Sequence, residues 1–202
     1  DDARKVLEQG KAGGLSGDAV TELEGRLSGS DINKFVKAYN NLEYENLFKW
    51  AQEFLKKHPL NPKIYEMLAK AYGAVGRNVD AELTYRQLII LVPNNANFYN
   101  DFGVIRSNQL AINYLMDLKK AVYLNPLLNN SYNNQGIYFY QKRKYLISLN
   151  QYKKAILLSP NRNESYNNLA TSQKELGRFA VGELNLIRAL MLQPKYKEAI
   201  EN

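Results

Sequence analysis

The side chains that most often carry catalysis are scarce or scattered in this sequence of 202 residues. It contains no cysteine, which excludes thiolate chemistry and disulfide bonds. Its single histidine, His58, directly precedes a proline, which is typical of a surface position at a helix end rather than of a general base. The carboxylates are spread over predicted helix surfaces, and the glycines form no phosphate-binding loop. We therefore predict no enzymatic activity, no metal site and no cofactor.

Asparagine is the polar residue whose spacing is most informative. Pairs of polar residues recur directly after a tyrosine in three successive segments: Asn100 and Asp101, Asn133 and Asn134, and Asn167 and Asn168. Amide side chains both donate and accept hydrogen bonds, so a row of them can bind the backbone of an extended peptide whatever its sequence. A second interpretation is that asparagine at this place only stabilises the fold.

The pairs follow a period that runs through most of the chain. Five of the six prolines lie 34, 33, 34 and 34 residues apart in succession, at Pro59, Pro93, Pro126, Pro160 and Pro194. Between them, apolar residues recur with helical spacing on two short segments joined by a polar turn. A fixed period of this size is typical of a stack of one supersecondary unit, so we predict an all-α solenoid of helix-turn-helix repeats.

The repeating unit resembles the tetratricopeptide repeat at its packing positions. An aromatic residue opens each first helix, at Tyr65, Tyr99, Tyr132 and Tyr166. A small residue follows four positions later, at Ala69, Gly103, Gly136 and Ala170. Small residues recur in the second helix as well, at Ala81, Ser148 and Gly182. The resemblance extends from about Ser28 to Tyr196, and it implies a right-handed superhelix whose first helices line a concave groove.

We predict five repeats preceded by a helical cap. The cap covers residues 1–27, and the repeats cover 28–61, 62–95, 96–128, 129–162 and 163–196; residues 197–202 begin a further helix. The first repeat is atypical, and the third is one residue short between Asn108 and Leu110. Four residues depart from the repeat pattern at helix contacts, where we expect them to find partners in the groove or to extend toward solvent: Arg106, Tyr114, Gln135 and Gln173.

The resemblance places the asparagine pairs in the groove, because the tyrosine and the small residue of each first helix point into the stack. The predicted partner-binding residues are Lys63, Glu66, Lys70, Asn97, Asn100, Asp101, Val104, Asn130, Asn133, Asn134, Ile137, Tyr140, Asn167, Asn168 and Thr171. Some members of the family hold a C-terminal carboxylate with a clamp of lysine and asparagine. No repeat of this chain offers the full set, so we do not predict that ligand.

The formal net charge of +7 leaves an anionic partner as an alternative. The basic residues fall mostly at helix ends and turns, where cations suit the helix dipole. The largest group is the basic turn, which consists of Lys142, Arg143 and Lys144. We interpret most of these charges as ordinary solvated surface and do not expect nucleic acid as the partner, but this turn is where an anionic partner would bind.

The sequence thus predicts a non-catalytic scaffold or adaptor that binds a protein partner or an extended peptide in its groove, within a larger complex. One alternative is a structural subunit of a larger assembly, or of a homo-oligomer, that uses its convex faces and an uncovered C-terminal end. The other is binding of nucleic acid or a lipid surface through the basic turn. No apolar run approaches the roughly 20 residues of a membrane helix. The sequence starts at Asp1 without an initiator methionine and shows no targeting segment, so cytoplasmic and exported locations both stay open.

Overall fold

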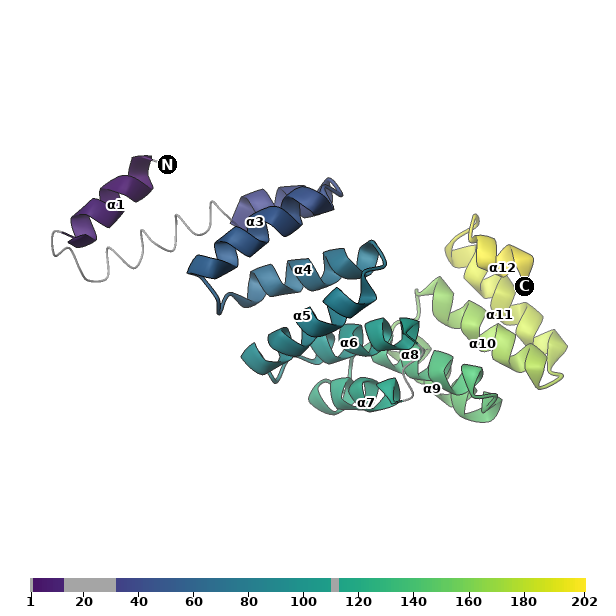
Figure 1. Cartoon of the computed structure of the whole chain (residues 1–202). Helices are drawn as coiled ribbons and strands as arrows, with labels where there is room; N and C mark the ends of the chain where they lie inside the picture. Colours follow the sequence, from purple (N-terminus) through teal and green to yellow (C-terminus); the bar gives the residue numbers. More distant parts are fainter. Residues whose placement is uncertain (1, 13–31, 110–112) are drawn as a thin grey trace. The chain divides into compact units, whose positions relative to one another are not determined.

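The computed structural model describes residues 2–12, 32–109 and 113–202, and within these ranges the chain forms helices joined by turns, with no strand (Figure 1). An unlabelled helix covers residues 32–40. The labelled helices are α1 (Asp2–Ala12), α3 (Tyr44–Lys57), α4 (Pro62–Ala74), α5 (Asn78–Leu91), α6 (Ala96–Asn108), α7 (Tyr114–Leu124), α8 (Asn129–Gln141), α9 (Tyr145–Leu158), α10 (Asn163–Glu175), α11 (Phe179–Leu192) and α12 (Lys197–Glu201). The predicted all-α helical-repeat fold is confirmed.

The chain forms two compact units, residues 1–84 (unit 1) and residues 85–202 (unit 2), and the boundary falls within α5. The second helix of the predicted cap, which would carry Val20, Leu23 and Leu27, lies outside the described residues, and so does Leu110 at the shortened turn of the third repeat. Each unit is described by itself below.

Asparagine and proline determine where two of the first helices begin. The Asn61 side chain accepts hydrogen bonds from the backbone N–H groups of Lys63 and Ile64, at 3.1 and 3.2 Å, and Pro62 occupies the first turn of α4. Such a cap satisfies N–H groups that have no partner within the helix, and proline loses nothing there because its missing N–H would be unpaired anyway. Asn95 caps α6 in the same way. The first helices of the regular repeats start at Pro62, Ala96, Asn129 and Asn163.

The turns between the paired helices share one backbone feature. A residue with positive φ lies at the same place of the period in each described turn: Leu42 (60°), Gly76 (76°), Arg143 (55°) and Gly177 (70°). The next N–H bonds back to a carbonyl of the first helix, as in Lys144 N to Phe139 O at 2.8 Å. Glycine adopts this conformation without cost, whereas arginine and leucine do not. The basic turn therefore has arginine at a position that favours glycine.

The core of unit 1 is aromatic. The rings of Phe35 and Phe54 meet edge to face with centroids 5.3 Å apart, and Phe48 stacks on Tyr72 at 4.4 Å. Both arrangements are favourable for aromatic quadrupoles and add to the burial of apolar area. Because Phe48 belongs to α3 and Tyr72 to α4, the second pair joins the atypical first repeat to the second.

In unit 2 the paired helices approach closely at glycine. A Cβ atom added to Gly136 would lie 2.3 Å from Cε1 of Tyr152, and one added to Gly103 would lie 2.8 Å from Cδ2 of Leu118. A larger residue at either place would therefore overlap the second helix of the same repeat. Tyr152 also packs with Leu149 and Leu169, which connects α9 to α10 of the next repeat. This packing positions the first helices of consecutive repeats beside each other.

Candidate functional site

The asparagine pairs of unit 2 connect consecutive repeats through hydrogen bonds. Asn100 Oδ1 accepts from Ser131 Oγ at 2.9 Å and from Asn134 Nδ2 at 3.0 Å. The same three groups meet one repeat later: Asn133 Oδ1 accepts from Ser165 Oγ at 3.4 Å and from Asn168 Nδ2 at 3.2 Å. Each acceptor amide thus receives a hydroxyl and an amide from the following repeat. We call these contacts the inter-repeat ladder.

The ladder corrects the expectation that both members of each pair face away from the core. The first members, Asn100, Asn133 and Asn167, are buried, with 5, 7 and 6% of their surface exposed. One residue after the tyrosine, the helix has turned toward the neighbouring repeat rather than toward the groove, and the donors found there satisfy the buried oxygen. The second members, Asp101, Asn134 and Asn168, are half-buried. Only these can face a ligand.

The ladder continues at its C-terminal end. Asn167 Oδ1 accepts from Asn202 Nδ2 at 3.0 Å. Asn202 lies 34 residues after Asn168 and so occupies the same place in the period. Ala199, which is buried, stands where the two preceding repeats have serine. The short helix α12 therefore packs in the register of a further first helix.

A mixed polar and apolar face runs along the first helices of unit 2, where α6 contacts α8 and α8 contacts α10. Its half-buried residues fall in two rows, one with Asp101, Asn134 and Asn168 and one with Val104, Ile137 and Thr171. Asn134 and Asn168 each donate from their side-chain nitrogen in the ladder. Among the described residues, no hydrogen bond engages the Oδ1 atom of either side chain. These two carbonyl oxygens can accept from a ligand. We call this surface the groove face.

A cavity of about 250 Å³ opens on this face between α6, α7 and α8. Its walls are formed by Val104, Ser107, Asn108, Tyr114, Leu118, Asn134, Ile137 and Gln141. Tyr114 is buried; its hydroxyl donates to Gln141 Oε1 at 2.8 Å, and its ring meets Tyr138 edge-on with centroids 5.0 Å apart. Burial raises the pKa of Tyr114, and Tyr138 adds to the rise, so the phenol stays neutral and remains a hydrogen-bond donor.

The other departures from the repeat pattern have partners in the packed helices rather than in the groove, where we expected them. Arg106 Nη1 lies 2.6 Å from Asp117 Oδ2, which joins α6 to α7. Gln135 is buried and donates to the backbone oxygen of Leu118 at 3.2 Å. Gln173, which is buried as well, accepts at Oε1 from Asn185 Nδ2 at 2.8 Å. These polar groups are compensated, and they connect neighbouring helices.

Three further predicted residues flank the two rows of the groove face. Asn130 Oδ1 of α8 accepts from Arg162 Nη1, just before α10. The Tyr140 hydroxyl donates to Glu175 Oε1 at 3.2 Å, which links repeats four and five. Burial raises the pKa of Tyr140, and the Glu175 carboxylate raises it further. Asn97 is exposed. The structure thus brings the predicted residues of three repeats onto neighbouring helices of unit 2.

The predicted residues of the second repeat belong to unit 1 and pair with one another. Glu66 Oε1 lies 2.6 Å from Lys70 Nζ, and Glu66 Oε2 lies 3.4 Å from Lys63 Nζ. Partial burial acts to raise the pKa of Glu66, but the hydrogen bond and charge of Lys70, with a further contribution from Lys63, outweigh it and lower the pKa below its ordinary value. Glu66 is therefore ionised at neutral pH and largely occupied by its own neighbours.

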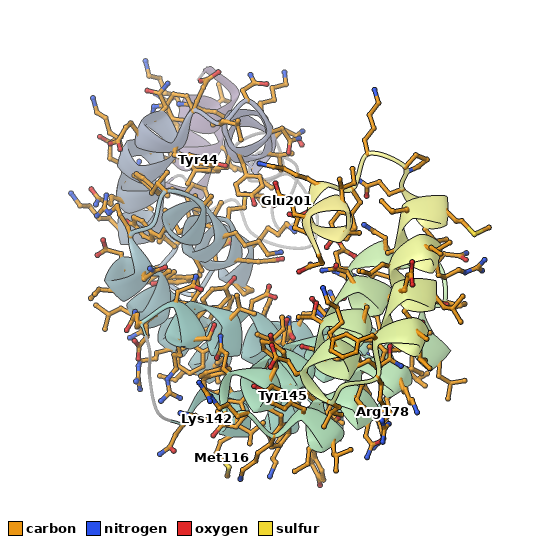
Figure 2. All side chains as sticks on the ribbon, turned by 90° about the vertical axis from the view of Figure 1, so that its right-hand side faces the viewer. Tyr44, Met116, Lys142, Tyr145, Arg178 and Glu201 are labelled. Carbon is orange, nitrogen blue, oxygen red and sulfur yellow. The ribbon has the colours of Figure 1, made fainter. Side chains whose placement is uncertain are left out.

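The basic turn lies between α8 and α9, and Lys142, Arg143 and Lys144 are all exposed. The Lys142 ammonium lies 6.0 Å from the centroid of the Tyr138 ring. Lys142 lies at the outer margin of unit 2 in Figure 2. Its role as a contact for an anionic partner stays a proposal.

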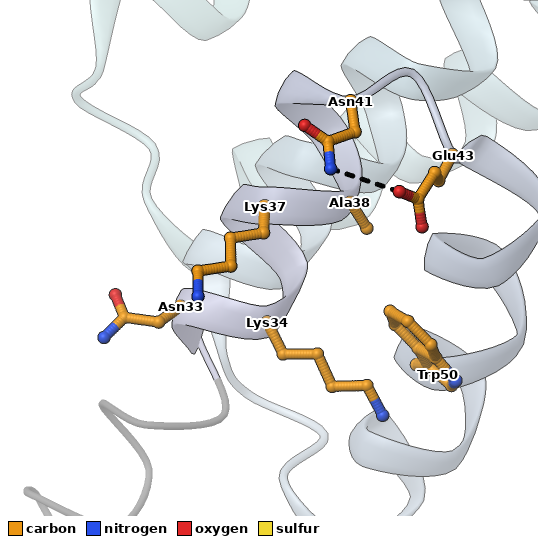
Figure 3. A pocket seen from close by; sticks show the side chains of 7 residues that line it. All are labelled: Asn33, Lys34, Lys37, Ala38, Asn41, Glu43 and Trp50. Atoms are coloured by element: carbon orange, nitrogen blue, oxygen red, sulfur yellow. Dashed lines mark hydrogen bonds between the residues drawn. The ribbon is translucent and has the colours of Figure 1, made fainter.

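Unit 1 contains a pocket that the sequence did not reveal (Figure 3). It encloses about 550 Å³ and is lined by Asn33, Lys34, Lys37, Ala38, Asn41, Glu43 and Trp50. The Lys34 ammonium lies 3.7 Å from the centroid of the Trp50 ring, a cation–π contact. Trp50 is the single tryptophan of the sequence, and this was the one available signal. Only the fold shows that Lys34 lies beside it.

Neither a metal-binding cluster nor a membrane-spanning helix is present in the described part of the chain. In the ranges that the structure covers, histidine, aspartate and glutamate side chains form no group of three or more that could hold a metal ion. None of the helices in those ranges combines the length and the apolar content needed to cross a bilayer.

Comparison with known proteins places the fold. No family model and no curated protein sequence matches this chain. Solved structures do match it. YrrB, described as a tetratricopeptide-repeat protein with an unusual peptide-binding site, is 15% identical with a TM-score of 0.66, over 100% of this chain and 97% of that one. TTC0263, a thermophilic tetratricopeptide-repeat protein of Thermus thermophilus, is 18% identical with a TM-score of 0.69, over 86% and 95%.

PilW, described as a widely conserved type IV pilus biogenesis factor, is 17% identical with a TM-score of 0.72, and the match covers 87% of each chain. These likenesses show the tetratricopeptide-repeat fold, which confirms the fold that the sequence resemblance implied.

Proposed function

We propose that this chain is a non-catalytic scaffold that binds an extended protein segment along the groove face of α6, α8 and α10. The observation that carries the proposal is the cavity beside the row of half-buried amides. The carbonyl oxygens of Asn134 and Asn168 can accept from the backbone N–H groups of a peptide. The cavity beside Val104 and Ile137 can receive one of its apolar side chains.

The size of the cavity favours a side chain over a small molecule. At about 250 Å³ it lies below the range of roughly 300–1,000 Å³ that is usual for sites of small molecules and cofactors. Its walls combine Val104 and Ile137 with the hydroxyl of Tyr114 and the amide of Asn134. Such a lining suits a peptide, whose side chain is apolar and whose flanking backbone is polar. YrrB, a structural neighbour, is described as peptide-binding, and this supports the same class of ligand.

The proposal can be tested with a displayed library of random peptides selected on the whole chain. We expect selection of peptides with one recurring apolar residue, and loss of at least about tenfold in their affinity on Val104→Arg, because the long cation fills the cavity. Asn150→Arg on the exposed face of α9 is the matched control, because it adds the same charge elsewhere. Peptides that bind the Val104→Arg variant as well as the parent chain would refute the proposal.

A second candidate function, a structural subunit of a larger assembly, is supported by α11. Its outer face exposes Leu184, Ile187 and Met191, with 65, 48 and 68% of their surface accessible, and such a stripe is unusual for a surface without a partner. PilW, another neighbour, is described as a pilus biogenesis factor. Sedimentation at increasing concentration would show self-association that Leu184→Glu abolishes; a monomer at all concentrations would argue against this function.

A further inference from the structure

The second helices of unit 2 end in a recurring pattern of charge and apolar exposure. The residue before the last of each helix is large, apolar and exposed: Ile90 (71%), Tyr123 (77%), Leu157 (83%) and Met191 (68%). We call these four residues the apolar edge. A cation precedes each of them by three or four positions, at Arg86, at Lys119 and Lys120, at Lys153 and Lys154, and at Arg188. All of these cations are exposed.

The spacing places each cation beside its apolar residue. Side chains three and four positions apart lie on the same face of a helix, one turn from each other. The apolar residues recur every 33 or 34 residues, so they occupy equivalent places on α5, α7, α9 and α11. Leu127, just after α7, is exposed to 74% and adds to the apolar surface. The result is a series of contact units, each with one apolar tip and one or two cations.

The charge around the edge is one-sided. Residues 85–202 contain 15 lysines and arginines against 7 aspartates and glutamates, whereas residues 1–84 contain 12 against 13. Within the described helical segments 85–91, 114–124, 145–158 and 179–192, Glu183 is the one exposed carboxylate. Asp117 is paired with Arg106 on α6. A surface that is both apolar and cationic requires a partner that is both apolar and anionic.

We propose that the apolar edge docks unit 2 on an anionic membrane surface. The tips enter the boundary between headgroups and acyl chains, and the neighbouring cations pair with anionic headgroups. The same contact unit recurs on each second helix, so a continuous surface of uniform chemistry can engage all of the units at once. A protein partner would need matching residues at the same period. A second copy that presented this face would bring cations against cations.

The apolar edge is separate from the basic turn and from the groove face. The turn precedes α9, whereas Leu157 lies near its end, about 18 Å further along the helix at 1.5 Å per residue. The edge residues line neither the cavity of unit 2 nor the Trp50 pocket. Membrane docking by the edge is therefore independent of whether the groove face binds a peptide.

Flotation of the whole chain with lipid vesicles tests the proposal. We expect the chain to float with vesicles that contain phosphatidylserine in phosphatidylcholine, and not with phosphatidylcholine alone. Y123S/L157S removes two tips, and we expect it to lower vesicle binding by at least about tenfold. K119Q/K153Q removes two charges, and we expect vesicle binding to fall about fivefold for each charge and to depend less strongly on salt. All four side chains are exposed, so these variants should fold normally.

F179S is the control for loss of a tip, because Phe179 is exposed to 65% at the start of α11, and Glu183 rather than a cation lies four positions from it. This variant should bind vesicles like the parent chain. Failure of the parent chain to bind anionic vesicles would overturn the proposal, and so would equal binding by Y123S/L157S. Self-association that Y123S/L157S abolishes, without vesicle binding, would assign the edge to contacts between copies instead.

Discussion

The two units fill the same places of the repeat with opposite chemistry. In unit 1, the residue before the opening tyrosine is Ile64, which is fully buried, and the residue after it is Glu66, which pairs with lysines of its own helix. In unit 2, two repeats have serine and asparagine at these places, and the asparagine Oδ1 of one repeat accepts from the serine of the next, as Asn100 does from Ser131. The same period thus allows two kinds of contact between consecutive repeats, which we call the apolar joint and the hydrogen-bonded joint.

The difference affects how precisely neighbouring repeats are positioned. Apolar contact is non-directional, so an apolar joint specifies area more than position. A buried amide oxygen is satisfied only when its donors lie at hydrogen-bond distance, so the ladder fixes the register of α6 against α8 and of α8 against α10. The cavity and the amide row of the groove face span these hydrogen-bonded joints. We infer that the ladder's main contribution is to hold that face in place.

The largest expected effect comes from breaking the ladder at its centre. Asn133→Ala leaves the hydroxyl of Ser165 and the amide of Asn168 without their acceptor, and Ser165 is fully buried. We expect the free energy of unfolding to fall by about 2 kcal/mol. Urea denaturation, with hydrogen exchange to localise the loss to α8 and α10, measures it. Glu66→Ala at the same place in unit 1 should cost less than about 1 kcal/mol, because its ion pairs are partly exposed.

A double-mutant cycle separates the joint from simple truncation. Ser165→Ala in the Asn133→Ala background removes one of the stranded donors, so the two changes together should cost less than the sum of the single changes. Additive losses would show that the two side chains do not stabilise the joint through their hydrogen bond.

The second largest effect concerns helix pairing within a repeat. Gly136→Ala places a methyl group where Tyr152 lies, and we expect a loss of about 2 kcal/mol in the free energy of unfolding. Unit 1 has Ala69 at this place, so the α4–α5 pair already accommodates the methyl group. Gly182→Ala is the control, because its added Cβ atom would lie 3.2 Å from the nearest atom, the backbone oxygen of Ala170. It should therefore cost less than Gly136→Ala. Tyr152→Leu should recover part of the loss in Gly136→Ala; no recovery would place the strain elsewhere.

Much of the fold could be predicted from the sequence because the residues that define the period act through local contacts. Proline, the opening tyrosine and the small residue recur every 33 or 34 positions, and each acts through contacts within its own repeat, as Gly136 does with Tyr152. The division into two units could not be predicted in this way. It falls within α5, which is one continuous helix from Asn78 to Leu91.

The candidate site was only partly predictable, because burial depends on neighbours that periodicity does not specify. Asn133 and Asn134 are consecutive and chemically identical, yet Asn133 is buried in the ladder and Asn134 borders the cavity. The serine that makes the burial of Asn133 possible, Ser165, lies 32 residues away. Trp50 and Lys34 meet for a similar reason, since the helix over residues 32–40 packs beside α3. Each of these features depends on contact between helices.

The smallest expected effect is a difference in pH dependence between the two kinds of joint. The folded pKa of Glu66 lies below its ordinary value, so its ion pairs stabilise unit 1 above the unfolded pKa, and this contribution is lost as the pH falls through the folded pKa. Glu66→Gln should therefore reduce stability by less than about 1 kcal/mol at neutral pH and not at all in acid. The ladder consists of amides and hydroxyls, which do not titrate in this range, so the loss caused by Asn133→Ala should be the same at both pH values. Urea denaturation of the three chains at neutral and acid pH checks both statements, and a Glu66→Gln difference that persisted in acid would assign its effect to packing rather than charge.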